Sequence, residues 1–287
     1  MFITVPQDKY FIIFKAATLN MCLVSHVVPS GDDIVCLQCF NDETYVVAGK
    51  LIFIYHRVKV IDTLDFHQKS ILGMCLIGSY LISYEEHVLY ITDMSNRQLI
   101  HSLTLLQTSP IAKIFHPATY LNKVVVVFEN SQIELWNVIK QRLVYTFQAH
   151  INFISSGDHS ISSIEQSPAL HVIAMGFSSG LILLINLKTD QVLFHFQQET
   201  AVTSLTFRTD VLAEKFPYLA SSNPEGVIHV WNLGDGSEDS PRRLQEKLEE
   251  AHRGYIASLH FLHGEPVLVS SSDDNSIKVE TPCIDFR

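Results

Sequence analysis

Residues 113–147 decide the fold, and they read KIFHPATYLNKVVVVFENSQIELWNVIKQRLVYTF. Within this stretch lie four short runs rich in β-branched and aromatic residues, at positions 113–116, 123–128, 132–137 and 142–147. Turn-forming residues, such as those at 129–131, separate the runs. Runs of this composition, joined by short turns, predict four consecutive antiparallel strands.

The same order of runs recurs along the chain. Later copies have runs at 162–166, 172–176, 181–186 and 191–196, and then at 202–207, 218–221 and 227–232. Weaker copies come earlier, with third runs at 51–55 and 87–91 and a first fragment at 11–14 and 18–20, and a partial copy ends at 276–279. The aligned position in the third run falls at Leu19, Tyr55, Ile91, Trp136, Ile185, Trp231 and Glu280. These positions are 36 to 49 residues apart, a spacing close to the period of about 40 to 45 residues of the WD repeat.

The repeat predicts an all-β fold, a seven-bladed WD-repeat β-propeller that forms a single domain over residues 1–287. A four-stranded sheet has two faces to cover, and it covers them by stacking on neighbouring sheets around a ring. The first copy lacks a clear opening strand and the last lacks a clear fourth strand, so the two ends could complement each other. Glu280 stands where a Trp is expected, so we expect a truncated or divergent C-terminus and a ring that is incomplete there. The expected blades cover approximately residues 9–32, 33–66, 67–106, 107–150, 158–198, 199–250 and 253–281.

Two kinds of residue mark the repeat positions. Trp-Asn pairs stand where WD repeats carry Trp-Asp, and an Asn follows the aligned Ile185. Three histidines, at 67, 150 and 252, fall near the loops that lead into blades, where WD repeats carry a Gly-His pair. We expect His252, Ser221 and Trp231 to form a hydrogen-bonded set that satisfies buried polar groups between strands. The predicted structural repeat positions are Trp136, Asn137, Asn186, Ser221, Trp231, Asn232 and His252.

Composition excludes several broad classes. Twenty Lys and Arg against 30 Asp and Glu give a net charge of -10, so the chain has no general attraction for phosphate backbones. No segment has the roughly 18 uninterrupted apolar residues of a membrane helix, and the N-terminus does not read as a signal peptide. Five cysteines at irregular spacing argue against a secreted disulfide framework and favour a reducing intracellular compartment. The polar segment Gly234–Pro241 predicts a loop, with no domain boundary.

The motifs that carry chemistry in other proteins have simpler explanations here. Cys36 and Cys39 have the spacing of half a zinc site, but they lie in an expected strand and no second pair follows. Asp273-Asp274-Asn275 is expected to be a turn, and so is Gly176–Gly180, which lacks the Lys of a phosphate loop. No G-x-S-x-G or H-E-x-x-H motif is present. We therefore expect no catalytic residue, no metal and no cofactor.

Several stretches outside the generic repeat pattern resemble one family, that of WD repeat-containing protein 36. They are His116–Lys123, Leu135–Val138, Leu143–Phe147, Ser204–Asp210, and Ala251-His252 leading to Ile256–Val269. The resemblance is strong from about residue 110 to 280 and weaker before that. Members of the family are longer, so the chain resembles only their first propeller. The resemblance implies a subunit that holds a subcomplex of the small-subunit processome on pre-ribosomal RNA in the nucleolus.

The sequence thus favours a non-catalytic scaffold in small-subunit processome assembly, which supports pre-rRNA processing and 18S rRNA maturation. Its expected partners are other protein subunits, with pre-rRNA and the small nucleolar RNA reached through the assembly, and neither a membrane nor a small-molecule substrate is expected. The alternative is a generic WD-repeat adaptor, such as a ubiquitin-ligase or coat-complex receptor subunit, which the repeat alone allows equally well. A propeller enzyme would need acidic or His residues converging on the mouth of the central channel, and fold alone does not supply them.

Overall fold

The computed structural model describes residues 2–4, 10–14, 22–56, 59–117, 119–154, 160–167, 171–209, 218–234 and 244–282. The aligned Leu19, the predicted run at 18–20 and most of the predicted loop Gly234–Pro241 lie outside these residues. The chain divides into two compact units. The first comprises Met1–His116, Tyr120–Phe128 and Glu134–Val144, and the second comprises Pro117–Thr119, Glu129–Ile133 and Tyr145–Arg287.

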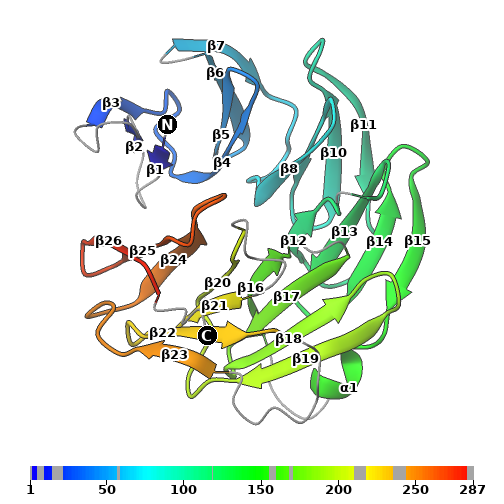
Figure 1. Ribbon diagram of the computed structural model, residues 1–287. Coiled ribbons are helices and arrows are strands. Elements are labelled where there is room, and N and C mark those ends of the chain that lie inside the picture. The colour runs from blue at the N-terminus through cyan, green and yellow to red at the C-terminus, as the bar shows by residue number, and fades with distance from the viewer. Residues whose placement is uncertain are drawn as a thin grey trace. The chain divides into compact units, whose positions relative to one another are not determined.

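The described residues form seven antiparallel sheets, named A to G in chain order, and in each the strands lie side by side in the order of the chain (Figure 1). The first unit holds sheets A to C and most of sheet D. Sheet A has strands β1 (Phe2–Thr4), β2 (Tyr10–Phe14) and β3 (Cys22–Val27). Sheet B has β4 (Ile34–Phe40), β5 (Glu43–Ala48), β6 (Leu51–His56) and β7 (Lys59–Leu64), and sheet C has β8 (Gly73–Ile77), β9 (Tyr80–Tyr84), β10 (Val88–Asp93) and β11 (Gln98–Thr104).

Sheet D has β12 (Ile111–Phe115), β13 (Lys123–Phe128), β14 (Ile133–Asn137) and β15 (Arg142–Phe147), which confirms the four strands predicted for residues 113–147. The single helical turn α1 (Ile151–Ile154) follows β15 and belongs to the second unit. Sheet E has β16 (Ile161–Gln166), β17 (Val172–Phe177), β18 (Leu181–Asn186) and β19 (Gln191–Gln197). Sheet F has β20 (Ser204–Phe207), β21 (Tyr218–Ser222), β22 (Ile228–Asn232) and β23 (Leu244–Leu248), and sheet G has β24 (Ile256–Phe261), β25 (Leu268–Ser272) and β26 (Ile277–Glu280).

A β-bulge recurs at one place in four of the sheets. The pairing of the third strand with the fourth shifts by one residue just before Tyr55, Thr92, Ile185 and Trp231. These four residues are therefore equivalent, and the sequence alignment that placed Ile91 in the set was wrong by one position. The error has a physical cause, since Ile91 is the large aliphatic residue that hydrophobicity favours and Thr92 is a small polar one.

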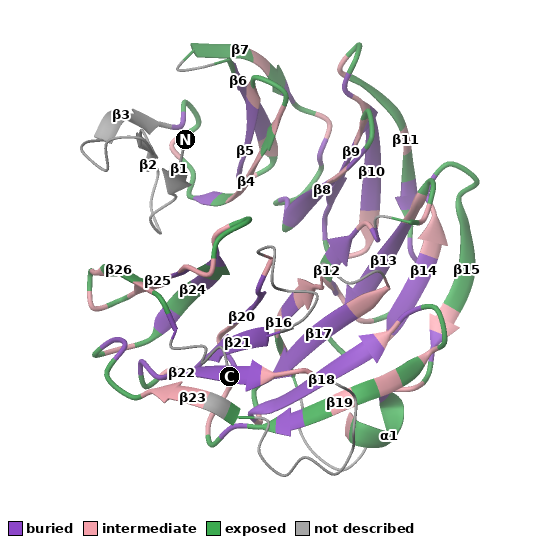
Figure 2. Cartoon of the chain, in the orientation of Figure 1, coloured by how far each residue is buried: buried purple, intermediate pink, exposed green. Residues whose placement is uncertain are grey.

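Burial follows the order of strands within a sheet (Figure 2). The second and third strands are buried along nearly their whole length, as in β17 and β18, whereas the fourth strands are mostly exposed. Apolar clusters form between consecutive sheets of one unit: Ile182 and Phe196 of sheet E pack with Leu205 and Trp231 of sheet F. Because each sheet buries its faces only against a neighbour, the core is a series of contacts between sheets.

None of the helices among the described residues is long and apolar enough to cross a membrane.

Candidate functional site

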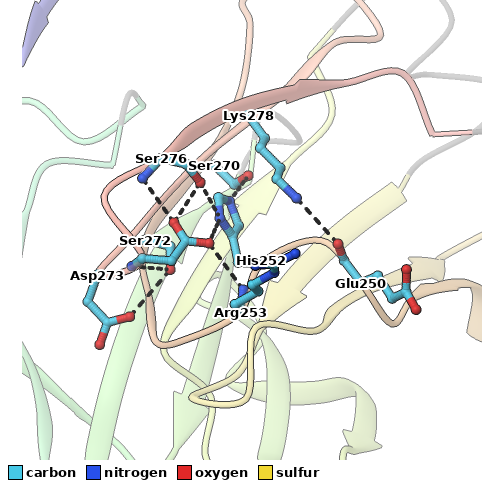
Figure 3. Close-up of polar contacts among 9 residues, drawn as sticks. Glu250, His252, Arg253, Ser270, Ser272, Asp273, Ser276 and Lys278 are labelled. Carbon is cyan, nitrogen blue, oxygen red and sulfur yellow. Dashed lines mark hydrogen bonds and ion pairs between the residues drawn. The ribbon is translucent and has the colours of Figure 1, made fainter.

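His252 lies at the centre of a buried polar network at the entry to sheet G (Figure 3). Its Nδ1 is 3.0 Å from a carboxylate oxygen of Asp274, and its Nε2 is 2.8 Å from the hydroxyl of Ser270. A carboxylate only accepts, so Nδ1 carries the proton and Nε2 accepts from Ser270. The Ser276 hydroxyl and then the Arg253 amide, with His252 contributing less, hold the pKa of the Asp274 carboxyl well below its usual range.

Sheet C repeats this geometry with a different acid. His67 lies 2.8 Å from the hydroxyl of Ser83 through Nε2 and 3.2 Å from the carboxylate of Glu85 through Nδ1. That carboxylate also accepts from the backbone amides of Gln68 and Lys69. Burial lowers the pKa of His67, and the hydrogen bond to Glu85 opposes this effect only in part. The neutral imidazole therefore joins the loop before the sheet to its second strand.

Sheets D and F make the same kind of link with glutamine. In sheet F the indole Nε1–H of Trp231 donates to the Ser221 hydroxyl at 2.8 Å, and that hydroxyl donates to Gln198 Oε1 at 2.8 Å. In sheet D the indole of Trp136 donates to Glu134 at 2.7 Å, and the amide of Gln107 donates to the other oxygen of Glu134 at 2.6 Å. The buried indole N–H of Trp231 and the partly buried one of Trp136 thus each have a partner, as a donor removed from water requires.

The structure confirms only part of the hydrogen-bonded set predicted for His252, Ser221 and Trp231. Ser221 and Trp231 are hydrogen-bonded as expected, but Gln198 completes their chain, while His252 bonds to Ser270 in the next sheet. The reason is topological, because His252 precedes the first strand of sheet G and so reaches the second strand of that sheet. The sequence signal for Gln198 was its place shortly before the first strand of sheet F, which mirrors the place of His252 before β24.

Three of the predicted positions share one local role. Asn137, Asn186 and Asn232 each end a third strand, and the side-chain oxygen of each accepts a backbone N–H from the turn that follows. Such side chains stabilise the turn by standing in for a backbone acceptor. The donors are Lys140 at 2.8 Å, Lys188 at 2.9 Å and Gly234 at 2.8 Å, respectively.

The motifs considered for metals and phosphates are structural where they are described. Cys36 and Cys39 lie in β4, and burial raises the pKa of the Cys36 thiol to about 11. Among the described residues, no group of three or more His, Cys, Asp or Glu side chains is placed to hold a metal ion. Residues 273–275 form the turn between β25 and β26, which confirms that predicted turn. Of the turn predicted at Gly176–Gly180, only residues 178–180 lie between β17 and β18, because Gly176 and Phe177 belong to β17.

Ser270, His252 and Asp274 have the connectivity of a hydrolase triad, with a hydroxyl, an imidazole and a carboxylate in line. The geometry does not make them a reaction centre, because Ser270 is 2% exposed and His252 is 4% exposed. A substrate cannot reach the hydroxyl, and the imidazole donates and accepts within the protein. The network therefore stabilises the sheet.

A surface cavity is present in the described residues of each unit. The cavity of the second unit, about 400 Å³, lies where the first strands of sheets E to G end. Its lining includes His171, His260, His263, Glu165, Phe207 and Phe261. The recess of the first unit, about 790 Å³, is lined by residues that include Arg97, which bridges Glu43 at 2.7 Å and Asp62 at 3.2 Å. Such mixed polar and apolar linings suit contacts with polar side chains of a protein partner.

The comparisons with known proteins agree with this architecture. A family model described as the WDR36/Utp21 first beta-propeller matches residues 3–281. The chain is 34% identical over 96% of its length to the U3 small nucleolar RNA-associated protein 21 homolog of Schizosaccharomyces pombe, and 30% identical over 97% to WD repeat-containing protein 36 of Homo sapiens. It is 27% identical over 96% to U3 small nucleolar RNA-associated protein 21 of Saccharomyces cerevisiae. The chain spans about 29% of the length of each of these relatives.

Among solved structures, a chain in the crystal structure of a mitotic checkpoint complex matches with a TM-score of 0.75. The match covers 96% of this chain and 82% of that one at 13% sequence identity, so it speaks for the fold alone. Together with the repeated sheets, it identifies the all-β fold as a β-propeller. The chain therefore belongs to the WDR36/Utp21 family, as a stretch similar to its first β-propeller.

Proposed function

We propose that the chain is a non-catalytic scaffold in assembly of the small-subunit processome, where it supports pre-rRNA processing and 18S rRNA maturation in the nucleolus. The observation that carries the proposal is the family match over residues 3–281, together with relatives whose names associate them with the U3 small nucleolar RNA. The buried polar links support the non-catalytic part, because their hydroxyls and imidazoles are occupied in holding strands together.

We further propose that residues 1–287 form one propeller domain of seven blades, with the blade boundaries given by the repeat and with the last blade incomplete. Support comes from the seven sheets of the described residues, which follow one another in chain order. The recurring bulge before the position of Trp231 supports a common blade plan. Among the described residues, sheets A and G have three strands each and the other five sheets have four.

The partners of this scaffold are other protein subunits of the processome, and RNA is reached through the assembly. The net charge of -10 supports this order, since a chain of that charge repels phosphate backbones except at local patches. Strands that are paired on both sides hold the loops between them in defined positions. Loops positioned in this way favour docking of a protein partner at the loop faces and cavities. The proposal includes neither a membrane nor a small-molecule substrate.

The test is affinity purification of the tagged chain from its own cells, with mass spectrometry of the proteins and sequencing of the RNA. We expect processome subunits together with pre-rRNA and the U3 small nucleolar RNA. Nuclease treatment before elution separates the contacts, because protein partners persist and RNA is lost if RNA is held through the assembly. A tagged propeller of similar size from another family is the control. A partner set shared with that control, or one typical of a ubiquitin ligase or coat complex, would favour the generic adaptor instead.

A further inference from the structure

Three cations lie at the end of sheet D where β13 begins, β14 ends and β15 begins. Lys123 is the first residue of β13, Lys140 lies in the turn after β14, and Arg142 is the first residue of β15. The backbone amide of Val138 donates to the carbonyl of Asn122 at 3.0 Å, which joins the turn after β14 to the residue before β13. The three cations therefore lie at one end of a single sheet, within the first unit.

These cations have no carboxylate of their own sheet beside them. Between residues 111 and 147 the only acidic residues are Glu129, which follows β13, and Glu134, near the start of β14. Both belong to the opposite end of the sheet. None of the ion pairs among the described residues includes Lys123, Lys140 or Arg142. A chain with a net charge of -10 thus carries a local positive surface.

The neighbouring sheets can be aligned with sheet D residue by residue. In sheets C, D and E the same backbone hydrogen bond joins the turn after the third strand to the residue before the second strand. The donors are Met94, Val138 and Leu187, and the acceptors are Ser79, Asn122 and His171. The last residue of each turn also has a positive φ, and these residues are Arg97, Gln141 and Asp190.

The alignment shows that the fold does not require the three charges. The positions of Lys123, Lys140 and Arg142 are held by uncharged residues in both neighbouring sheets. They are Tyr80, Asn96 and Gln98 in sheet C and Val172, Thr189 and Gln191 in sheet E. The same turns and strands therefore form without cations, and a role in binding explains why sheet D has all three.

Exposed aliphatic side chains accompany the cations. Leu121, two residues before Lys123, is 85% exposed, and Ile139, next to Lys140, is 39% exposed. With Arg142, these residues make up what we call the basic end of sheet D. A segment that carries both carboxylates and aliphatic side chains is complementary to such a surface, because it pairs with the cations and also removes the aliphatic groups from water.

A nucleic acid would use less of this surface. Its phosphates could pair with the cations, but Leu121 and Ile139 would stay in water. Bases stack mainly on aromatic rings, and the nearby ring of Tyr120 already has the Lys123 ammonium 5.3 Å from its centroid. A long polyanion would also meet more repulsion from the acidic chain than a short peptide segment does. A protein segment is therefore the better fit.

We propose that the basic end of sheet D docks an acidic segment of a partner protein, whose Asp and Glu side chains pair with Lys123, Lys140 and Arg142 and whose aliphatic side chains pack on Leu121 and Ile139. This proposal deepens the scaffold function, since it gives the chemistry of one partner. Its test uses isolated peptides, so its failure is distinct from a failure to recover processome subunits.

The first test is fluorescence anisotropy with the full chain and synthetic peptides that carry an uncharged fluorophore. The probe is GDLEDLEG, and the matched peptide GNLQNLQG replaces each carboxylate by an amide of similar size. We expect the amide peptide to bind about tenfold more weakly, since several exposed ion pairs are lost. The peptide GDSEDSEG, without the aliphatic side chains, should also bind more weakly. Equal affinity for probe and amide peptide, or no binding of either, overturns the proposal.

The second test locates the binding surface. Lys140→Glu/Arg142→Glu should weaken binding of the probe at least tenfold, whereas Lys50→Glu/Arg253→Glu, at exposed positions outside the basic end, makes the same change in net charge and should leave it nearly unchanged. The reversed peptide GKLKKLKG should bind the first variant more tightly than the second, a gain that misfolding cannot produce. An equal loss of probe binding in the two variants would show that total charge governs binding, and the proposal would be wrong.

The third test separates a protein segment from a nucleic acid. Leu121→Ser should weaken binding of the probe and leave the fold intact, because the side chain is almost fully in water. A labelled 12-nucleotide oligouridine should bind more weakly than the probe. Tighter binding of this RNA, lost in Lys140→Glu/Arg142→Glu, would assign the surface to nucleic acid and overturn the proposal.

Discussion

Gln198 and His252 hold the same place before the first strand of consecutive sheets, and they make the same link with different atoms. His252 accepts from a serine hydroxyl through a ring nitrogen, and Gln198 accepts from one through its amide oxygen. Either side chain both donates and accepts, which is the property that a buried link needs. At the scale of single residues, two different residue types thus make the same kind of hydrogen-bonded link to a serine hydroxyl.

Ser221→Ala tests the link in sheet F. The substitution leaves the Trp231 indole N–H and the Gln198 amide oxygen buried without this partner, so we expect a loss of about 1 to 3 kcal/mol in the free energy of unfolding. Urea denaturation followed by tryptophan fluorescence measures the loss. Ser258→Ala, at an exposed position, is the control and should change the free energy by less than about 0.5 kcal/mol. Equal effects of the two substitutions would show that the link contributes nothing.

The buried histidines predict a fall in stability on acidification. Burial lowers the pKa of His150, and the hydrogen bond to the Ser131 carbonyl offsets it only in part. The folded pKa then lies below the unfolded value of 6.5, so the unfolded chain binds more protons below that pH and stability decreases as the pH falls through it. The lowered pKa values of His67 and His229, also due to burial, act in the same direction.

His150→Gln keeps an amide donor for Ser131 but removes the titration. We expect the free energy of unfolding of this variant to change less between pH 7.5 and pH 5.5 than that of the unaltered chain, as measured by urea denaturation at both values. His263→Gln, at an exposed position, is the control for the replacement of one histidine by glutamine. An unaltered slope in His150→Gln would mean that the pH dependence arises at other groups.

At the scale of elements, two glycines in tight turns show how the backbone of a turn constrains the sheet it belongs to. Gly226 lies in the turn between β21 and β22 at a φ of +84°, and a Cβ there would meet the backbone carbonyl of His252. Gly264 has a similar φ of +79°, but a Cβ there would meet open space. The two glycines therefore separate the cost of backbone conformation from the cost of crowding.

Gly264→Ala should lower the free energy of unfolding by about 1 to 2 kcal/mol, the cost of a left-handed conformation with a Cβ. Gly226→Ala should lower it by more than this amount, because the loop that carries His252 must also shift. Thermal and urea denaturation of the two variants give the comparison. If the two substitutions cost the same, the close approach to His252 imposes no constraint of its own.

Strand positions were predictable from composition, and register was not. The run predicted at 142–147 is β15, and the run at 181–186 is β18, because β-branched and aromatic runs between turns have few alternatives. The bulge before Thr92 left no mark in the sequence, since a one-residue shift changes pairing without changing composition. Gln198 was missed for a related reason, because glutamine is common at surfaces and only its position before β20 distinguishes it.

At the scale of the whole molecule, stability depends on neighbouring sheets supporting each other. Leu205 of sheet F, 3% exposed, packs in the cluster that joins it to sheet E. Leu205→Ala should cost about 2 to 5 kcal/mol, and hydrogen exchange should speed up in both β17 and β22. Leu193→Ala, at a position 41% exposed on β19, is the control and should leave exchange in both strands nearly unchanged. Faster exchange confined to sheet F would mean that the sheets open independently.

The fold and the family could be predicted from the sequence because both rest on patterns spread over the whole chain. The candidate binding surfaces could not, since His171, His260 and His263 are up to 92 residues apart in sequence and meet only where the first strands of sheets E to G end.

The variety of polar links has a consequence for how the chain avoids folding wrongly. A chain of similar repeats is at risk of exchanging equivalent strands between neighbours, a common failure of repeat proteins. In four of the sheets the preceding loop is joined to a strand through a different set of side chains. These sets are His67 with Ser83 and Glu85, Gln107 with Glu134, Gln198 with Ser221, and His252 with Ser270 and Asp274. An exchanged strand would bury donors without acceptors. The differences between these polar sets therefore favour pairing of each strand within its own sheet over pairing in a neighbouring one.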